Sequence, residues 1–357
     1  MSTDMRNPVN LRATLRSVPL LLVLCVLMGC GGPPPELQDL KPFAETRTLM
    51  GTVVSITVYA PTYEQAEAAT SRAYKHMANL EGALSASVPN SDVSLINDLA
   101  GVPSPVSPAA LFVITRALEI SKLTNGAFDI TVGPLLSLWR DSAQRERLPT
   151  DTDLEEARLR VGYEKVAVSN APGNPTVMIP AGSSIDLGGI AKGYIVDQGV
   201  GILRRHVSSA LIDAGGDIYA LGTKPGNEPW VIGVQDPRRP QDLSALIETL
   251  HVADCAVATS GNYARYFEVE GKRYSHIVDP RTGWPVDRVP SATIIARDAT
   301  TADALATAAS VLDPEDSLRL IQSLPGVEAL LFIREGERWL RYSSEGIDAL
   351  VEERAER

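Results

Sequence analysis

The feature that most restricts the fold is the succession of short strand-like runs and helical segments that follows residue 50. Thr52–Tyr59 alternates β-branched residues with others, which predicts a strand, and Tyr63–Leu84 carries apolar residues near helical spacing. Further helices are expected between Ser107-Pro108 and Asn125-Gly126, from about Ile190, and over Thr301–Leu312. Further strands are expected at Thr176–Ile179, Ala210–Ile212, Trp230–Gln235, Ala256–Thr259, Ala264–Val269, Arg273–Val278, Ser291–Ala296, Glu328–Ile333 and Arg338–Tyr342. Antiparallel strands mixed with helices indicate an α+β fold, with mixed or antiparallel sheets and packed helices.

Composition narrows the class of protein. The chain is 44% hydrophobic and 22% charged, which allows a buried core. Its net charge of -11 argues against nonspecific binding to nucleic acid, and its 3 cysteines exclude a disulfide scaffold and a Cys-rich zinc site. The length of 357 residues permits one large or two modest domains, and the charged stretch Arg140–Glu156 is the best candidate for an internal hinge.

The N-terminus resembles a bacterial lipoprotein signal. Three arginines precede the apolar run Val18–Met28, which is too short to span a bilayer comfortably and ends in Leu27-Met28-Gly29-Cys30. We therefore expect a signal peptide at 1–29, a lipidated Cys30 and a flexible tether at 30–44 that contains a Gly-Pro run. The protein would then be a periplasm-facing membrane lipoprotein of the bacterial cell envelope. A plain secretory signal or a short membrane anchor is the alternative.

The segment Ile185–Tyr194 combines paired glycines with the start of a helix. Glycines let the backbone approach a ligand closely, and the first turn of a helix offers unpaired N–H groups to a phosphate. Lys192 would add a cation, and Asp186 could accept a hydrogen bond from a ribose or a base. By itself, such a glycine turn with a surface lysine is more often structural.

Two oxygen-bearing side chains share one face of the helix expected over Thr301–Leu312. Asp303 and Thr307 are spaced i and i+4, and a carboxylate with a hydroxyl suits Mg²⁺. The alternative is that Thr301 caps the helix and Asp303 complements its dipole.

His276 lies among turn residues, polar groups and glycine in the segment Tyr274–Gly283. It could act as a general base or position a phosphate. Ser260 lacks a GxSxG elbow and no HExxH is present, so a serine hydrolase and a zinc enzyme are poorly supported.

Taken in order, the motifs resemble the ApbE family of FAD:protein FMN transferases. The segments that carry the resemblance are Met50-Gly51-Thr52, Gly126–Trp139, Ile185–Tyr194, Leu211–Gly222, Ala258–Tyr263, Tyr274–Gly283 and Thr301–Ala308. The resemblance covers roughly residues 45 to 335 and implies an ApbE-like, T-fold-related domain over 45–345, followed by a charged tail at 346–357.

The resemblance also implies a reaction: FMN passes from FAD to a Thr or Ser hydroxyl of a target flavoprotein, and AMP is released. It assigns FAD contacts to Met50, Ala127, Phe128, Asp129, Asp186, Lys192 and Ile277. It assigns Mg²⁺ to Asp303, Thr307 and the backbone carbonyl of Gly189, and it gives His276 a role in the attack. The targets would be subunits of Nqr or Rnf redox complexes or other FMN-binding domains. One departure is Ser87, which stands where family members commonly carry an aromatic residue against the flavin.

Two other functions use the same residues. The first is a Mg²⁺-dependent FAD pyrophosphatase, in which water replaces the protein hydroxyl and free FMN is released. The second is a non-catalytic periplasmic lipoprotein that stores or delivers FAD, although storage requires no acid–base group such as His276.

Overall fold

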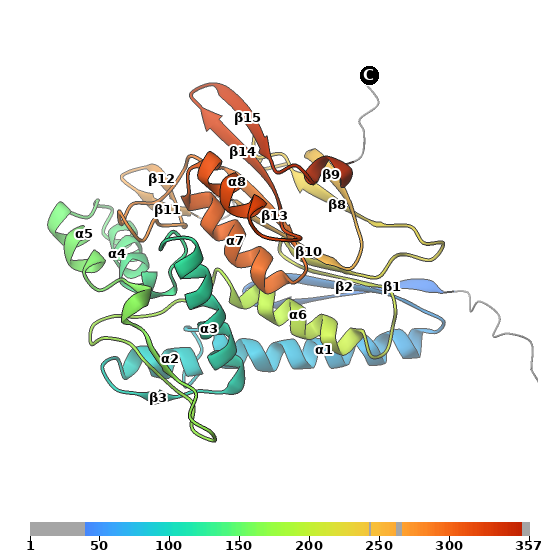
Figure 1. The fold of residues 1–357 in the computed structure, drawn as a ribbon, viewed down its shortest axis with the longest axis horizontal. Helices are drawn as coiled ribbons and strands as arrows, with labels where there is room; N and C mark the ends of the chain where they lie inside the picture. Colours follow the sequence, from blue (N-terminus) through green and yellow to red (C-terminus); the bar gives the residue numbers. More distant parts are fainter. Residues whose placement is uncertain (1–39, 243, 262–265, 352–357) are drawn as a thin grey trace, which may run out of the picture. The chain divides into compact units, whose positions relative to one another are not determined.

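The computed structural model describes residues 40–242, 244–261 and 266–351, and these residues belong to one compact unit. At its centre is an eight-stranded sheet in the order β1-β2-β6-β7-β10-β13-β14-β15, with every neighbouring pair antiparallel (Figure 1). The strands are β1 (Lys41–Leu49), β2 (Thr52–Ala60), β6 (Ala210–Ala214), β7 (Asp217–Leu221), β10 (Cys255–Gly261), β13 (Ser291–Ala296), β14 (Glu328–Glu335) and β15 (Arg338–Ser343). This is the α+β architecture expected from the sequence.

One face of the sheet is covered by the helices α1 (Tyr63–Leu84), α6 (Ala191–Leu203) and α7 (Ala299–Val311) (Figure 1). The helix α3 (Pro108–Leu123) contacts α1 and α7, and α8 (Pro314–Gln322) follows α7. Small residues bring these helices together: a Cβ added to Gly199 of α6 would lie 2.8 Å from the Met77 sulfur of α1. The helix packing thereby fixes the start of α6, which faces the site described below.

The opposite face of the sheet is covered by the hairpin of β8 (Trp230–Gln235) and β9 (Leu246–Val252). Because neighbouring side chains of a strand point to opposite faces, Val257 and its partner Ile295 join the core under this hairpin. Ala258 and its partner Ile294 join the core under the helices instead. Both faces of the central strands are therefore buried.

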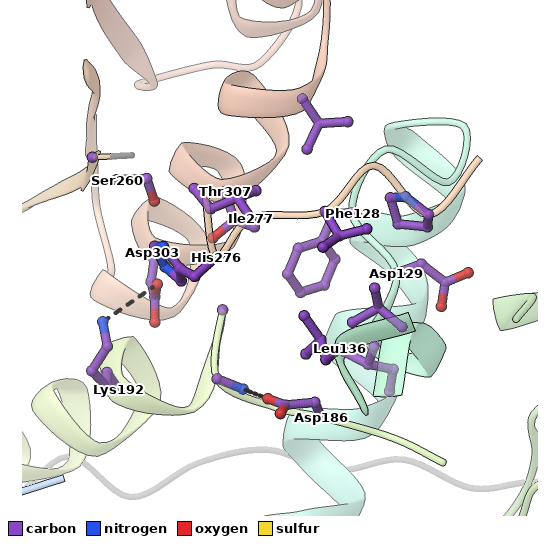
Figure 2. A pocket seen from close by; sticks show the side chains of 18 of the residues that line it. Phe128, Asp129, Leu136, Asp186, Lys192, Ser260, His276, Ile277, Asp303 and Thr307 are labelled. Atoms are coloured by element: carbon purple, nitrogen blue, oxygen red, sulfur yellow. Dashed lines mark hydrogen bonds and ion pairs between the residues drawn. The ribbon is translucent and has the colours of Figure 1, made fainter. Parts of the chain in front are cut away.

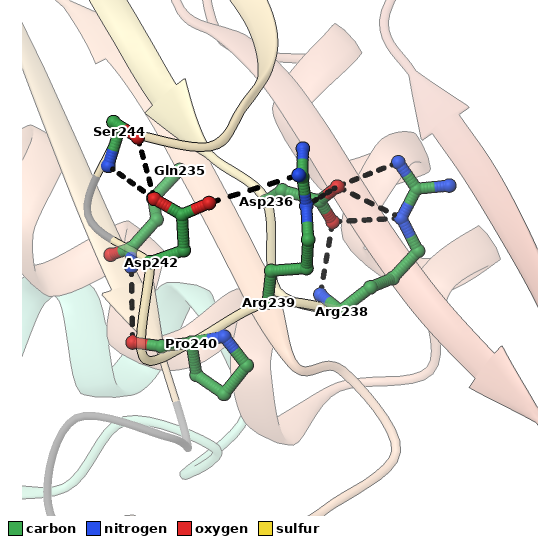
Figure 3. Close-up of polar contacts among 7 residues, drawn as sticks. All are labelled: Gln235, Asp236, Arg238, Arg239, Pro240, Asp242 and Ser244. Atoms are coloured by element: carbon green, nitrogen blue, oxygen red, sulfur yellow. Dashed lines mark hydrogen bonds and ion pairs between the residues drawn. The ribbon is translucent and has the colours of Figure 1, made fainter.

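A group of charged side chains holds the connection between β8 and β9 (Figure 3). Asp236 accepts hydrogen bonds from the Arg238 backbone N–H at 2.9 Å and from Nε and Nη2 of the same arginine at 2.8 and 2.7 Å. Arg239 Nε lies 3.7 Å from Asp236 and its Nη1 lies 3.7 Å from Asp242. We call Asp236, Arg238, Arg239 and Asp242 the Asp236 cluster; it pairs each charge with a neighbour in sequence.

The remaining elements build a second, smaller layer beside the sheet. They are α2 (Asp92–Asp98), α4 (Gly133–Gln144), α5 (Asp151–Arg158), β3 (Ser104–Pro105), β4 (Ala167–Ser169), β5 (Thr176–Met178), β11 (Tyr266–Val269), β12 (Lys272–Ser275) and the 3₁₀ turns Ile130–Val132 and Tyr163–Lys165. A third 3₁₀ turn, Ile347–Ala349, packs instead in the core under the β8–β9 hairpin. Trp139 is fully buried in the second layer among Leu135, Ala157 and Val269. The proposed hinge at Arg140–Glu156 is therefore wrong, because α4 and α5 pack around this tryptophan within one compact unit.

Several expected boundaries also change. Strand β1 begins at Lys41, so the last residues of the expected tether pair with β2. Ile347 is fully buried and the Leu350 carbonyl accepts from His251 N–H at 2.7 Å, so the expected tail packs against the domain as far as Val351. The signal peptide and Cys30 lie outside the described residues. Within the described part of the chain, no helix is long and apolar enough to cross a membrane.

Candidate active site

A cavity of about 460 Å³ opens where the helical face of the sheet meets the second layer (Figure 2). The chain reaches it from distant segments, including the loop before α6, the β12–β13 connection and the helix α7. The residues predicted from the sequence that line it are Ala127, Phe128, Asp129, Asp186, Gly189, Lys192, His276, Ile277, Asp303 and Thr307. Met50 is not among the lining residues; it forms the β1–β2 turn with a φ of 54° and donates its N–H to Glu81 at 2.9 Å.

The glycine loop before α6 forms the floor of the cavity. Asp186 Oδ1 accepts from the Gly188 N–H at 2.7 Å, which closes a tight turn just before the helix begins at Ala191. A Cβ added to Gly189 would lie 3.0 Å from Thr307 Oγ1 and 3.2 Å from the Phe128 ring. A larger residue here would force Thr307 or Phe128 to shift, because these contacts are tighter than ordinary van der Waals contacts.

The start of α7 is held by two carboxylates. Asp298 is the cap and accepts from the Thr301 N–H at 2.7 Å, so the suggestion that Thr301 caps this helix is wrong. Asp197 of α6 accepts from the N–H groups of Ala299 and Thr300 at 2.7 and 2.9 Å, and burial raises its pKa to about 6. These contacts fix α7 so that Asp303 and Thr307 both face the cavity.

Asp303 is a buried carboxyl group that lies close to a second buried carboxylate. It is only 3% exposed, and its Oδ2 accepts from the Gly193 N–H at 3.0 Å. Lys192 Nζ lies 3.9 Å from its Oδ1 but makes its close contact with a second buried carboxylate, Asp217. Burial, and then the charge of Asp217, raise the pKa of Asp303 to about 7. Two carboxylates thus share one ammonium.

The donors gathered here fit a magnesium ion. Asp303, Thr307 and Gly189 all line the cavity, and they carry a carboxylate, a hydroxyl and a backbone carbonyl, which are hard oxygen donors. Among the described residues no group of three or more His, Cys, Asp or Glu side chains could hold a metal. A cation here would therefore need further ligands from a substrate or water, which is usual for Mg²⁺.

Asp129 has a structural function that the sequence did not reveal. Its Oδ1 accepts from Thr131 N–H and Oγ1 at 2.8 and 2.7 Å, and its Oδ2 accepts from the Tyr163 N–H at 2.9 Å. Burial raises the pKa of this carboxyl group. Both oxygens are thus engaged within the protein, and the side chain holds the chain next to Phe128, whose ring lies in the cavity wall (Figure 2).

His276 reaches the cavity because β12 ends earlier than expected. The strand predicted over Arg273–Val278 stops at Ser275, whose Oγ accepts from the Ile277 N–H at 3.1 Å and turns the chain. Further along, Asp279 accepts from Arg281 Nε and Nη2 at 2.9 Å and stabilises the next turn. His276 and Ile277 consequently line the cavity, in which Asp303 and Thr307 also lie (Figure 2).

Sequence reasoning missed other lining residues. Arg140 of α4 lies at the cavity with Nη2 3.7 Å from Asp186 Oδ2. The aromatic side chains that line the cavity, among the described residues, are Phe128, Tyr266 and Phe267, whereas Ser87 is exposed and does not line it. The one available signal was the Tyr-Phe pair within the strand expected over 264–269.

Known proteins are similar to this chain in sequence. The model of the ApbE family matches residues 50–331. A FAD:protein FMN transferase of Treponema pallidum is 35% identical over 328 residues, which cover 87% of this chain and 89% of that protein. A FAD:protein FMN transferase of Vibrio cholerae is 30% identical over 330 residues, covering 91% of this chain and 95% of that protein.

Known structures share the fold. The ApbE protein of Thermotoga maritima superposes with a TM-score of 0.79 at 37% identity, covering 88% of this chain and all of that one (100%). The flavinyl transferase ApbE of Pseudomonas stutzeri gives a TM-score of 0.75 at 30% identity, covering 87% of this chain and 97% of that one. The order of the motifs, the antiparallel sheet and these likenesses agree, and the chain belongs to the ApbE family.

Proposed function

We propose that this protein is a FAD:protein FMN transferase that moves FMN from FAD to a Thr or Ser hydroxyl of a target flavoprotein and releases AMP. The observation that carries the proposal is the convergence of Gly189, Lys192, His276, Asp303 and Thr307 on one cavity. The names of the relatives and of the structural neighbours support the same reaction.

The chemistry is attack on a pyrophosphate. The acceptor oxygen forms a bond to the phosphorus of the FMN half, and the bond from that phosphorus to the AMP oxygen breaks. A Thr hydroxyl is a weak nucleophile at neutral pH, so a nearby base must take its proton, and His276 is the candidate. Lys192 and the N–H groups at the start of α6 would stabilise negative charge on the phosphates. Magnesium, held by Asp303, Thr307 and Gly189, would neutralise the phosphate oxygens further.

The aromatic lining suits the flat ring systems of FAD. Phe128, Tyr266 and Phe267 line the cavity, and stacking with aromatic side chains is favourable. We propose that these rings contribute ring contacts to bound FAD. Ser87, which is exposed, would contribute none.

A transfer assay separates this function from its alternatives. The protein is incubated with FAD, Mg²⁺ and a candidate FMN-binding domain of the Nqr or Rnf type, and the acceptor is analysed by intact mass. We expect an acceptor that gains FMN less one water, together with equimolar AMP and flavin that survives gel denaturation. Free FMN with AMP and an unmodified acceptor would indicate a pyrophosphatase instead. Absence of AMP would indicate a binding protein.

We further propose that Cys30 is lipidated and anchors the enzyme on the periplasmic side of a bacterial membrane. The support is the sequence Leu27-Met28-Gly29-Cys30 after a basic and apolar leader. Mass spectrometry of the mature protein should show a chain that begins at an acylated Cys30. The Cys30→Ala variant should keep its leader and lose that modification.

A further inference from the structure

Asp217 is a buried carboxylate to which neither the sequence motifs nor the proposed reaction gives a role. It is the first residue of β7 and pairs with Ala258 in the central sheet, so its backbone is held rigidly. Its side chain is 4% exposed and forms an ion pair with Lys192. Burying such an ion pair costs free energy unless both charges have good partners. The place of this pair next to Asp303 therefore suggests that it has a role there.

The backbone of Lys192 cannot move relative to Asp303. The next residue, Gly193, packs so closely on α7 that an added Cβ would lie 2.1 Å from the Ala299 carbonyl oxygen and 2.9 Å from Asp303 Cβ. The Gly193 N–H also donates to Asp303 Oδ2 at 3.0 Å. Only the lysine side chain is therefore able to change partner, and its ammonium lies 3.9 Å from Asp303 Oδ1, at the outer limit of an ion pair.

We propose that Asp217 is a positioning residue that holds the Lys192 ammonium and prevents it from pairing directly with Asp303. This inference rests on the proposed function, in which Asp303 holds a divalent cation. An ammonium in direct contact with Asp303 would compete with that cation for the same carboxylate. Held by Asp217, the ammonium remains available to the phosphates of the substrate without occupying the metal position.

The test is Mn²⁺ binding to the full protein, measured by the loss of the free-Mn²⁺ electron paramagnetic resonance signal. Asp217→Asn should weaken Mn²⁺ binding by roughly 10–100-fold, the range seen when a residue that orients a metal ligand is lost. Lys192→Gln should bind Mn²⁺ at least as tightly as the wild type, because the competing cation is gone. In the Lys192→Gln background, the loss caused by Asp217→Asn should be about tenfold smaller, since coupled residues are not additive.

Asp213→Asn is the matched control. Asp213 is a neighbouring carboxylate on β6 that accepts from the Gly216 N–H at 3.0 Å, and an asparagine oxygen can keep that bond. Its Mn²⁺ affinity should stay within about threefold of the wild type, and thermal unfolding should show that all variants are folded. If Asp217→Asn fails to fold, a weakened Lys192→Gln alone would still contradict the inference.

Two results would overturn the inference. Equal losses on removing Asp217 with and without Lys192 would mean that Asp217 acts as a ligand or through its charge alone. Unchanged Mn²⁺ binding in Asp217→Asn would leave it a purely structural residue. The proposed function has a separate test: if Mn²⁺ binds normally but no FMN is found on the acceptor, that function is wrong.

Discussion

Two buried aspartates show how differently this chain treats a carboxylate. Asp236 is 1% exposed and Asp303 is 3% exposed. Asp236 lies between Arg238 and Arg239, and its hydrogen bonds with Arg238 hold its pKa below the ordinary value (Figure 3). Asp303 has one backbone N–H and a lysine already engaged by Asp217, and burial raises its pKa (Figure 2). The first carboxylate stabilises a turn, whereas the second lines the cavity, where we propose that it binds a cation.

The two sites also differ in where their partners come from. Arg238 and Arg239 follow Asp236 by two and three residues, so Asp236 finds both arginine partners within one turn. Lys192, Asp217 and Asp303 come from α6, β7 and α7 and meet only when the domain is folded. The contacts of Asp303 therefore depend on the tertiary fold, and a buried carboxylate with a raised pKa in a cavity is typical of a functional site.

The largest effect should follow the loss of the Asp303 carboxylate. Asp303→Asn preserves the shape and the Gly193 contact but removes the carboxylate. We expect FMN transfer to fall by about 10⁴-fold or more, because several kcal/mol of charge stabilisation by the metal is lost. Single-turnover transfer to an acceptor domain measures it, with Asp236→Asn as the control. Near-normal turnover of Asp303→Asn at limiting Mg²⁺ would remove the metal assignment.

His276→Ala should lower transfer by roughly 10²–10⁴-fold, the usual range for a lost acid–base group. FAD affinity should change much less, since His276 is one of several groups around the cavity. At saturating Mg²⁺, which keeps Asp303 ionised, the loss of His276 should also remove the fall in rate at acid pH that protonation of a catalytic histidine produces. FAD binding and single-turnover rates from pH 5 to 9 check both points. Weakened FAD binding with an unchanged acid limb would contradict the general-base role.

Replacing each of the two aspartates by asparagine should change the free energy of unfolding in opposite directions. The pKa of folded Asp303 is raised, so metal-free protein loses stability as pH rises from about 4 to 7 and the buried group ionises. Asp303→Asn should therefore stabilise the metal-free protein at pH 8 by roughly 1–4 kcal/mol, and much less at pH 5. Asp236→Asn should destabilise by about 1–3 kcal/mol at pH 8 through lost charged hydrogen bonds. Urea unfolding at both pH values measures these changes in the free energy of unfolding. If both variants changed it in the same direction at pH 8, the contrast between the two aspartates would be wrong.

The smallest effect should come from removing the N-terminal segment. A chain that begins at Leu40 retains all of β1, which pairs with β2 along its length. We expect its rate of transfer to a soluble acceptor to stay within about twofold of the full chain, because no described cavity residue precedes Thr52. A shortened chain that folds normally by circular dichroism but transfers slowly would give the removed residues a part in the reaction.

Much of the framework could be predicted from local pattern. The helix at Tyr63–Leu84 and the strands at Trp230–Gln235 and Ser291–Ala296 form as expected, because their periodicity and end residues agree. Asp303, Thr307, Gly189 and Lys192 were found together because they lie in compact motifs. Their presence in one cavity supports their proposed roles without testing them.

The rest depended on tertiary contacts that leave no local pattern. Asp217 is one aspartate in a Gly-Gly-Asp turn, and only the approach of α6 to β7 makes it the partner of Lys192. Arg140 looked like part of a hinge, because its neighbours are charged, yet its helix packs through Trp139. The early end of β12 depends on a Ser275 hydroxyl that accepts from the backbone, which alternation of side chains cannot predict.

The most direct test of the account is the number of protons released when the metal binds. Divalent cations require an ionised carboxylate, so a group with a pKa near 7 must release its proton on binding. Calorimetric titration of the protein with Mn²⁺ in buffers of different ionisation enthalpy measures this number. We predict close to one proton released at pH 6, close to none at pH 8.5, and no such binding by Asp303→Asn. Binding of equal strength by Asp303→Asn, or binding at pH 6 without proton release, would contradict the proposal that Asp303 binds the cation.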